Sequence, residues 1–309
     1  MQGVQGHPYK VPMGKTLQVL ADRKNMIDDL VAAGEVLDMR FQEGRATLSL
    51  RAAKMLHSLV AAAGADAGKA VVHRIPLASF QMHLAKEELI EIARELFGVM
   101  VRLEITNAKG KKATKIGPLL ADLERDDDAD GDMRYELSPV LREVLRSSNH
   151  WAVLSRKAVL AFQSRYSLRL YELLSLRVGL DKVASEQFSI DDLRALLGVP
   201  TGKLTRWQDL RRKVIETAIA EVTHLTGLAV RYEAVKRGRS VTAVKLIWRE
   251  KSKTERDAAA AELDRSSVGR RVRQEGTAEQ VVGAASDMAT PEDFRKLIAG
   301  LGRSKRAVD

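Results

Sequence analysis

The sequence predicts an α+β protein made of two tandem winged-helix domains. The clearest observation is the order of patterns in the second half, which runs helix, short strand, helix, turn, helix and β-hairpin. That order is typical of a winged helix. The first half follows the same order with weaker signals, and a chain of 309 residues has room for two domains.

Changes in composition divide the chain into four parts. Residues 1–44 have weak periodicity and scattered glycines, which predicts a partly ordered N-terminal arm. Residues 45–150 and 151–250 are the two expected winged-helix domains. Aromatic residues nearly vanish after the second domain, so we expect residues 251–309 to be a mobile tail with one short helix at Pro291–Ile298.

The elements of the first domain follow from the spacing of its apolar residues. The expected elements are a helix at Thr47–Ala63, a strand at Val71–Ile75, a short helix at Pro76–Leu84, a helix at Lys86–Phe97, a strand at Val99–Thr106, an extended segment at Thr114–Leu123 and a strand at Met133–Leu137. Ser138 and Pro139 then begin a short helix, with serine as the N-cap and proline at the first position.

The second domain has sharper signals. The expected elements are a helix at Ser155–Val178, a helix capped by Ser189, a third helix that begins near Thr205, and strands at Leu228–Ala234 and Val241–Trp248. Thr205 and Gln208, three residues apart, form a capping-box pattern at the start of the third helix.

Charge separates the two domains. The net charge of the chain is +10, yet residues 1–150 contain 21 basic and 21 acidic residues. Residues 151–250 contain 18 basic and 10 acidic residues. A basic domain joined to a neutral one is typical of a module that binds a polyanion. A basic face that is simply exposed to solvent would have the same numbers of charged residues.

Composition also argues against several classes of function. The absence of cysteine excludes disulfides and thiolate metal sites, and the six histidines have no metal-ligand spacing. No glycine-rich phosphate loop is complete, so we expect no enzyme activity, no cofactor and no metal. No apolar run is long enough to span a membrane and no secretory signal is evident, so we expect a cytoplasmic protein associated with the nucleoid or a plasmid.

The third helix of the second domain is the candidate element for reading DNA. The residues expected to contact bases in the major groove are Arg206, Gln208, Arg212 and Lys213. Arginine can bind guanine with two hydrogen bonds and glutamine can bind adenine in the same way. Arg211 falls nearer the apolar side of the helix, where its stem can pack while its charged head reaches solvent.

A second group of cations suits the phosphate backbone. The residues expected in this role are Lys236, Arg237 and Arg239 at the hairpin tip, Lys203 in the turn, and Arg165 on the first helix. Charge that protects an edge strand is the alternative explanation for the hairpin tip.

Three stretches of the second domain resemble one family. Ser164–Leu174, Phe188–Gly198 and Arg206–Glu216 resemble the signatures of the plasmid replication initiators that bind iterons through two winged helices. In the first domain, Leu96–Gly98 before a strand and Tyr135–Pro139 before a short helix are similar to the N-terminal domain of that family.

The resemblance implies a function without catalysis. Such initiators bind direct repeats at a plasmid origin, help to melt adjacent DNA, control copy number, and recruit the host initiator and the replicative helicase. It also implies monomers that initiate and dimers that repress their own gene, with dimer contacts in the first domain. We therefore expect the first domain to carry dimerisation, at Leu103 and Ile105, and an accessory DNA contact.

Two other functions fit the same sequence. A winged-helix transcriptional regulator with no replication role would have a similar charge distribution. A single-stranded-DNA or primase-like enzyme fits less well, because no acidic metal cluster lies on a strand. A row of direct repeats beside the gene would favour initiation, and one inverted repeat would favour repression.

Overall fold

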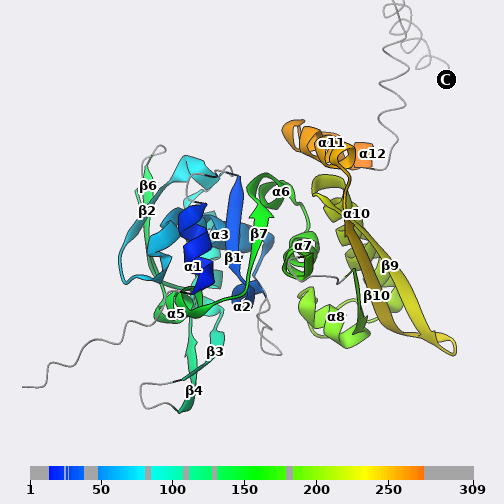
Figure 1. The fold of residues 1–309 in the computed structure, drawn as a ribbon, viewed down its shortest axis with the longest axis horizontal. Helices are drawn as coiled ribbons and strands as arrows, with labels where there is room; N and C mark the ends of the chain where they lie inside the picture. The colour runs from blue at the N-terminus through cyan, green and yellow to red at the C-terminus, as the bar shows by residue number, and fades with distance from the viewer. Residues whose placement is uncertain are drawn as a thin grey trace, which may run out of the picture. The chain divides into compact units, whose positions relative to one another are not determined.

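The structure is a computed structural model that describes residues 14–23, 26, 28–37, 48–80, 85–106, 111–126, 131–178 and 184–274. Two winged-helix domains follow one another along the chain, as predicted (Figure 1). We call them WH1 and WH2. In the described part of the chain, no helix has the length and apolar character needed to cross a membrane.

WH1 contains a three-stranded antiparallel sheet, in the order β2-β6-β5, with helical elements before β2, between β2 and β5, and after β6. Its elements are α3 (Leu50–Ala63), η1 (Gly64–Gly68), β2 (His73–Pro76), η2 (Leu77–Phe80), α4 (Lys86–Gly98), β5 (Leu120–Arg125), β6 (Asp132–Leu137) and α5 (Pro139–Ser147). A separate hairpin of β3 (Val101–Thr106) and β4 (Lys112–Gly117) is inserted after α4. The predicted cap is confirmed, because the Ser138 hydroxyl accepts a hydrogen bond from the Leu141 amide at 3.1 Å.

WH2 repeats this plan with a sheet in the order β8-β10-β9. Its elements are α7 (Arg165–Val178), β8 (Ser185–Ser189), α8 (Ile190–Leu196), α9 (Trp207–Leu210), η3 (Arg211–Glu216), α10 (Thr217–Leu225), β9 (Leu228–Arg237) and β10 (Ser240–Glu250). The predicted cap of α8 is confirmed, because the Ser189 hydroxyl accepts a hydrogen bond from the Asp192 amide at 3.1 Å.

The N-terminal segment differs from the predicted arm. It forms α1 (Lys15–Asp22), β1 (Asp29–Ala33) and α2 (Gly34–Leu37). Strand β1 pairs antiparallel with β7 (Trp151–Ser155), and the two strands lie side by side in Figure 1. Val31 and Ala33 belong to the core of WH1, whereas Leu30 and Ala32 belong to the core of WH2.

The burial of β1 on both faces explains why its sequence has no alternating pattern of apolar and polar residues. Successive side chains of a strand point to opposite faces, and here each face meets a different core. A strand buried on both faces reads as a continuous apolar run rather than an alternating one. The run Leu30–Ala33 therefore lacked the period that marks a half-buried strand.

The helix predicted over Ser155–Val178 is interrupted. Ser155 ends β7, a short helix α6 (Arg156–Ala161) follows, and α7 starts only at Arg165. The buried carboxylate of Glu221, on α10, accepts hydrogen bonds from the Gln163 amide at 2.6 Å and the Ser164 amide at 3.3 Å. This contact satisfies backbone donors that the interruption leaves free.

The region after β10 also differs from the predicted tail. Helix α11 (Lys253–Asp264) follows directly, and Ala259 and Glu262 on it are buried. Residues Asp264–Asp309 form a second unit, in which α12 (Arg270–Gln274) is described. The helix predicted at Pro291–Ile298 lies outside the described residues.

Candidate nucleic-acid interface

The turn that leads into the third helix of WH2 is held from α8. The Arg194 guanidinium donates to the carbonyl oxygen of Leu204 at 2.8 Å and also to that of Lys203. Leu204 has a φ of 51°, which is an unfavourable backbone conformation for a branched side chain. Arg194 therefore orients the turn. The sequence did not predict this role, because Arg194 is one polar residue of an ordinary amphipathic helix.

The start of the reading helix, by which we mean α9, η3 and α10 together, differs from the predicted capping box. Arg206 is the N-cap residue, with extended backbone, and no side chain caps the helix. The predicted pairing of Thr205 with Gln208 is therefore wrong. As a consequence, Arg206 and Gln208 are both exposed at the end of the helix nearest the turn.

A π-helical turn, η3, interrupts the reading helix and changes which residues face solvent. Arg211, Arg212 and Lys213 are consecutive and all exposed, and the next two residues, Val214 and Ile215, are buried. A regular α-helix would turn about 100° per residue and would direct Arg211 toward the core, which was the expectation. The wider turn instead places three cations side by side on one surface.

Acidic neighbours distinguish among these cations. Lys213 pairs with Asp209 at 3.3 Å, and Arg211 pairs with Glu216 at 3.4 Å. Arg206 and Arg212 have no ion-pair partner in the part of the chain that the structure describes. Free guanidinium groups are the groups best suited to bind an anion or a guanine edge.

The hairpin of β9 and β10 forms the wing of WH2. Gly238 and Arg239 make a two-residue turn, in which only Gly238 has a positive φ of 63°. Lys236, Arg237 and Arg239 are all exposed at this tip, and none has an acidic partner within the described ranges. Figure 1 shows the two strands continuing beyond the helices of WH2 to this tip.

A contact joins the reading helix to the wing. The Tyr232 hydroxyl, on β9, donates to the Glu216 carboxylate at 2.9 Å. Partial burial and then the hydrogen bond and charge of Glu216 raise the pKa of Tyr232, so the phenol stays protonated as a donor. The same carboxylate pairs with Arg211, and it therefore links the basic helix face to the wing.

The remaining predicted backbone contacts lie in different places. Lys203 is exposed in the turn beside the reading helix. Arg165 lies at the start of α7, where its guanidinium stacks 4.9 Å from the centre of the Tyr166 ring. Arg165 also lines the crevice between WH1 and WH2.

WH1 presents a different surface at the equivalent position. Helix α4 occupies in WH1 the place of the reading helix in WH2, and its exposed residues include Ile90 and Phe97, which are 44% and 37% exposed. Glu87 and Glu91 are exposed on the same helix. Lys86 and Arg94 are also exposed there, so this surface mixes apolar, acidic and basic groups, in keeping with the neutral charge of residues 1–150.

The residues predicted for dimerisation lie on β3. Leu103 is opposite Lys115 and Ile105 is opposite Ala113 in the antiparallel pairing of β3 with β4. Within the described part of the chain, β3 pairs with no other strand, so one edge of its backbone has no partner there. The dimer contact itself stays a prediction.

Comparison with known families matches both domains. Residues 38–175 match the family model described as "Initiator Replication protein, WH1", and residues 189–248 match the one described as "Initiator Rep protein, WH2". The first match runs past the domain boundary expected at residue 150, because it includes α6 and most of α7. Comparison with curated protein sequences finds no match.

A solved structure shares the fold. "Crystal structure of Pi initiator protein in complex with iteron DNA" has a TM-score of 0.55 and 18% identity, over 73% of this chain and 98% of that chain. "Crystal structure of SeMet derivatives of domain2 and domain 3 of RctB" has a TM-score of 0.40 and 9% identity, over 66% of this chain and 83% of that chain. Because both winged helices are present in the expected order and the two family matches together span more than half of the sequence, this chain belongs to the initiator Rep protein family.

Proposed function

We propose that this chain is a plasmid replication initiator that binds repeated sites in double-stranded DNA. The observation that carries the proposal is the basic surface of WH2, where the exposed cations of the reading helix and the wing tip occur in a chain of the initiator family. The Pi initiator protein, which shares this fold, has been solved with iteron DNA.

The two parts of the basic surface have different tasks in this proposal. Arg206, Gln208, Arg212 and Lys213 enter the major groove, where arginine and lysine bind guanine and glutamine binds adenine. An α-helix fits that groove, and its exposed N-terminal half carries all four side chains. Asp209 neutralises Lys213 in the free protein, so Lys213 must exchange that partner for DNA.

Backbone contacts come from the cations that surround the reading helix. Lys236, Arg237 and Arg239 at the wing tip, and Lys203 in the turn, bind phosphates. Arg165 is the weakest member of the proposed group, because its guanidinium already contacts Tyr166. WH1 supplies an accessory DNA contact and the surface for self-association, at Leu103 and Ile105.

Initiation requires more than binding. We propose that the bound protein promotes melting of the adjacent origin DNA and recruits the host initiator and the replicative helicase. In the same proposal, monomers initiate, and dimers repress the gene of the protein and so control copy number. The proposed activity is DNA binding and the recruitment of partners, and it needs no catalytic group, cofactor or metal.

Replication of a minicircle tests this proposal directly. The purified chain is added to a host extract with a minicircle that carries the direct repeats of its own origin, and nucleotide incorporation is measured. Incorporation that needs the repeats, and that Arg212→Ala reduces, is the expected result. A minicircle with scrambled repeats is the DNA control.

A transcriptional regulator without a replication role is the second candidate. It would bind the same DNA and repress transcription, because the reading helix and the wing serve either task. Sequence-specific binding and repression with no incorporation in the extract would favour the regulator and would overturn the initiator proposal.

A further inference from the structure

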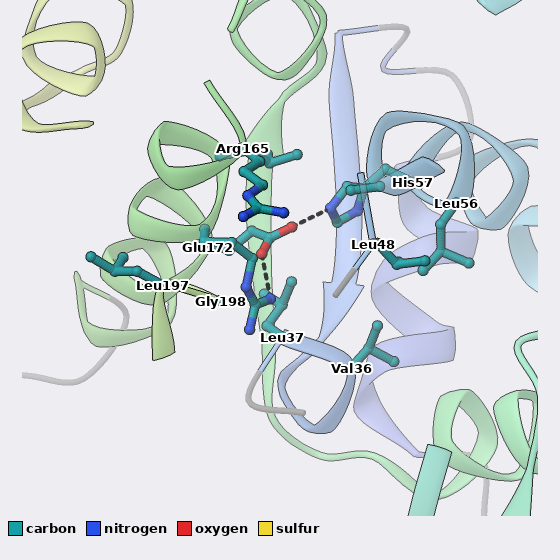
Figure 2. Close-up of a pocket in the computed structure, with 12 residues that line it drawn as sticks. Val36, Leu37, Leu48, Leu56, His57, Arg165, Glu172, Leu197 and Gly198 are labelled. Atoms are coloured by element: carbon teal, nitrogen blue, oxygen red, sulfur yellow. Dashed lines mark hydrogen bonds and ion pairs between the residues drawn. The ribbon is translucent and has the colours of Figure 1, made fainter. Parts of the chain in front are cut away.

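A buried polar contact joins WH1 to WH2. His57 on α3 and Glu172 on α7 meet across the crevice between the domains, with the histidine Nε2 atom 2.7 Å from the carboxylate Oε1 atom. The side chains are 6% and 4% exposed. Figure 2 shows the Glu172 carboxylate directed at the His57 ring from the opposite wall of the crevice.

Glu172 also has a partner within its own domain. Its other carboxylate oxygen accepts a hydrogen bond from the Arg169 guanidinium at 2.7 Å, one turn earlier on α7. Burial raises the pKa of Glu172, but the positive charge of Arg169 and the hydrogen bond of His57 outweigh it and lower the pKa. Glu172 is therefore a charged carboxylate whose counter-charge stays with it when WH1 moves away.

The surroundings of this contact are apolar and not fully filled. The crevice has a cavity of about 30 Å³ whose wall includes Val36, Leu37, Leu56 and Leu197 (Figure 2). A cavity needs about 10–15 Å³ of such volume to hold one water molecule. A water molecule therefore has room to replace the imidazole as a donor to Glu172 when the domains separate.

Lys54 extends the contact along the same face of α3. It lies three residues before His57, and its ammonium group donates to the carbonyl oxygens of Leu160 and Phe162, each at 2.7 Å. These carbonyls lie at the C-terminal end of α6, where a helix has unpaired acceptors and a partial negative charge. Helix α3 thus contacts both helices that precede the sheet of WH2.

We infer that His57 and Glu172 form a releasable joint that fixes how WH1 and WH2 are oriented, and thereby positions both domains on one DNA site. The part that concerns DNA rests on the proposed function. A buried polar contact of this kind adds little net stability, because the cost of desolvation offsets most of the attraction, so we assign it the task of fixing the arrangement of the domains. The double partnership of Glu172 makes the joint releasable, since opening it leaves the carboxylate paired with Arg169.

Because Glu172 has a second partner and His57 is the residue that reaches across from WH1, the central variant of the test changes His57. His57→Ala removes the contact between the domains and leaves Glu172 with Arg169, so the variant is expected to fold. His57→Gln restores a donor and is expected to restore the joint. Glu186→Gln is the matched control. Glu186, on β8, pairs at 3.2 Å with Arg177 of α7, the helix that also carries Glu172, and this ion pair lies entirely within WH2.

Distances between the domains provide a readout that does not depend on DNA. The chain has no cysteine, so cysteines placed at two exposed positions, Lys69 in WH1 and Arg231 in WH2, can carry spin labels. Pulsed dipolar spectroscopy on the full chain should give one narrow distance distribution for the parent, His57→Gln and Glu186→Gln. His57→Ala should give a broad distribution, with unchanged circular dichroism.

DNA binding is measured separately on the same proteins. If the competent orientation falls to about one tenth of the population, the affinity of His57→Ala for a full repeat falls roughly tenfold, because apparent affinity scales with that fraction. A narrow parent-like distribution for folded His57→Ala would overturn the joint, and an unfolded His57→Ala would overturn its releasable character. If the parent protein binds no repeat, the proposed function is wrong. The distance distributions would still show whether His57 and Glu172 fix the orientation of the domains.

Discussion

The wing tip allows the electrostatic part of DNA binding to be predicted in numbers. The triple variant Lys236→Ala, Arg237→Ala, Arg239→Ala removes three exposed cations that have no acidic partner within the described residues. The strands that carry them are paired over ten register positions, so we expect the hairpin to stay folded. Loss of affinity can then be assigned to lost phosphate contacts.

The magnitude follows from counterion release. Each neutralised phosphate contributes about −0.9 to the slope of log K against log salt, so three contacts contribute about −2.7. Between about 50 and 200 mM salt, that slope corresponds to an affinity change of about 40-fold. As salt rises over this range, the affinity of the parent should therefore fall about 40-fold further than the affinity of the triple variant. We expect the same difference on specific and non-specific DNA.

Fluorescence anisotropy with two duplexes measures both quantities. One duplex carries the direct repeat and the other has the same composition in scrambled order, and each is titrated at several salt concentrations. Arg231→Gln is the control, because Arg231 is an exposed cation of the same hairpin that already pairs with Glu233 at 2.6 Å. An unchanged salt slope for the triple variant, or a change confined to the repeat, would refute the assignment of the tip to phosphates.

Three further predictions concern the reading helix, the joint and the edge of WH1. Arg212→Ala should weaken binding to the repeat by about 1–3 kcal/mol and relax the preference at one base pair, which binding to single-base variants of the site measures. Because burial lowers the pKa of Lys54 to about 8, the folded state binds its proton less tightly than the unfolded state, and the free energy of unfolding should rise above pH 8. Urea unfolding at about pH 7 and about pH 9.5 should show that rise, on the order of 1 kcal/mol, and it should be larger in the parent than in Lys54→Met, where only Lys251, whose pKa burial also lowers, still contributes. Ile105→Lys should shift the protein from dimer to monomer in sedimentation velocity, with unchanged circular dichroism.

Each of these expectations has a result that contradicts it. Equal losses of Arg212→Ala on every duplex would make Arg212 a phosphate contact rather than a base contact. The same pH dependence in Lys54→Met would mean that another group causes the rise. An unfolded Ile105→Lys would place that side chain in the core of WH1, and an unchanged dimer would remove β3 from the interface.

Much of WH2 could be predicted because its signals are local. The serine cap of α8, the glycine turn of the wing and the apolar spacing of the reading helix each act within a few residues. The exposed cations followed from the same spacing, with one exception. Arg211 was assigned to the apolar side because the sequence contains no sign of the π-helical turn that exposes it.

The features that could not be predicted depend on distant partners. Glu172 and His57 are 115 positions apart, and Glu221 meets the amides of Gln163 and Ser164 from more than 50 positions away. An acidic residue on a regular amphipathic helix normally faces solvent, so neither carboxylate was distinguishable from a surface residue. Strand β1 was missed for the related reason that its partner strand and both of its cores lie far along the chain.

Strand β1 affects how this protein can exchange parts with its relatives. Its alternate side chains complete two cores, and its partner strand β7 belongs to the segment that leads into WH2. A recombination event at residue 150 would transfer WH2 and β7 without the strand that covers them, and would expose Leu154 and its neighbours in the new protein. A chimera that takes residues 29–33 from the same parent as WH2 keeps the pairing of β1 with β7, but it places Val31 and Ala33 against the WH1 core of the other parent. We therefore expect the N-terminal segment, WH1 and WH2 to be inherited together.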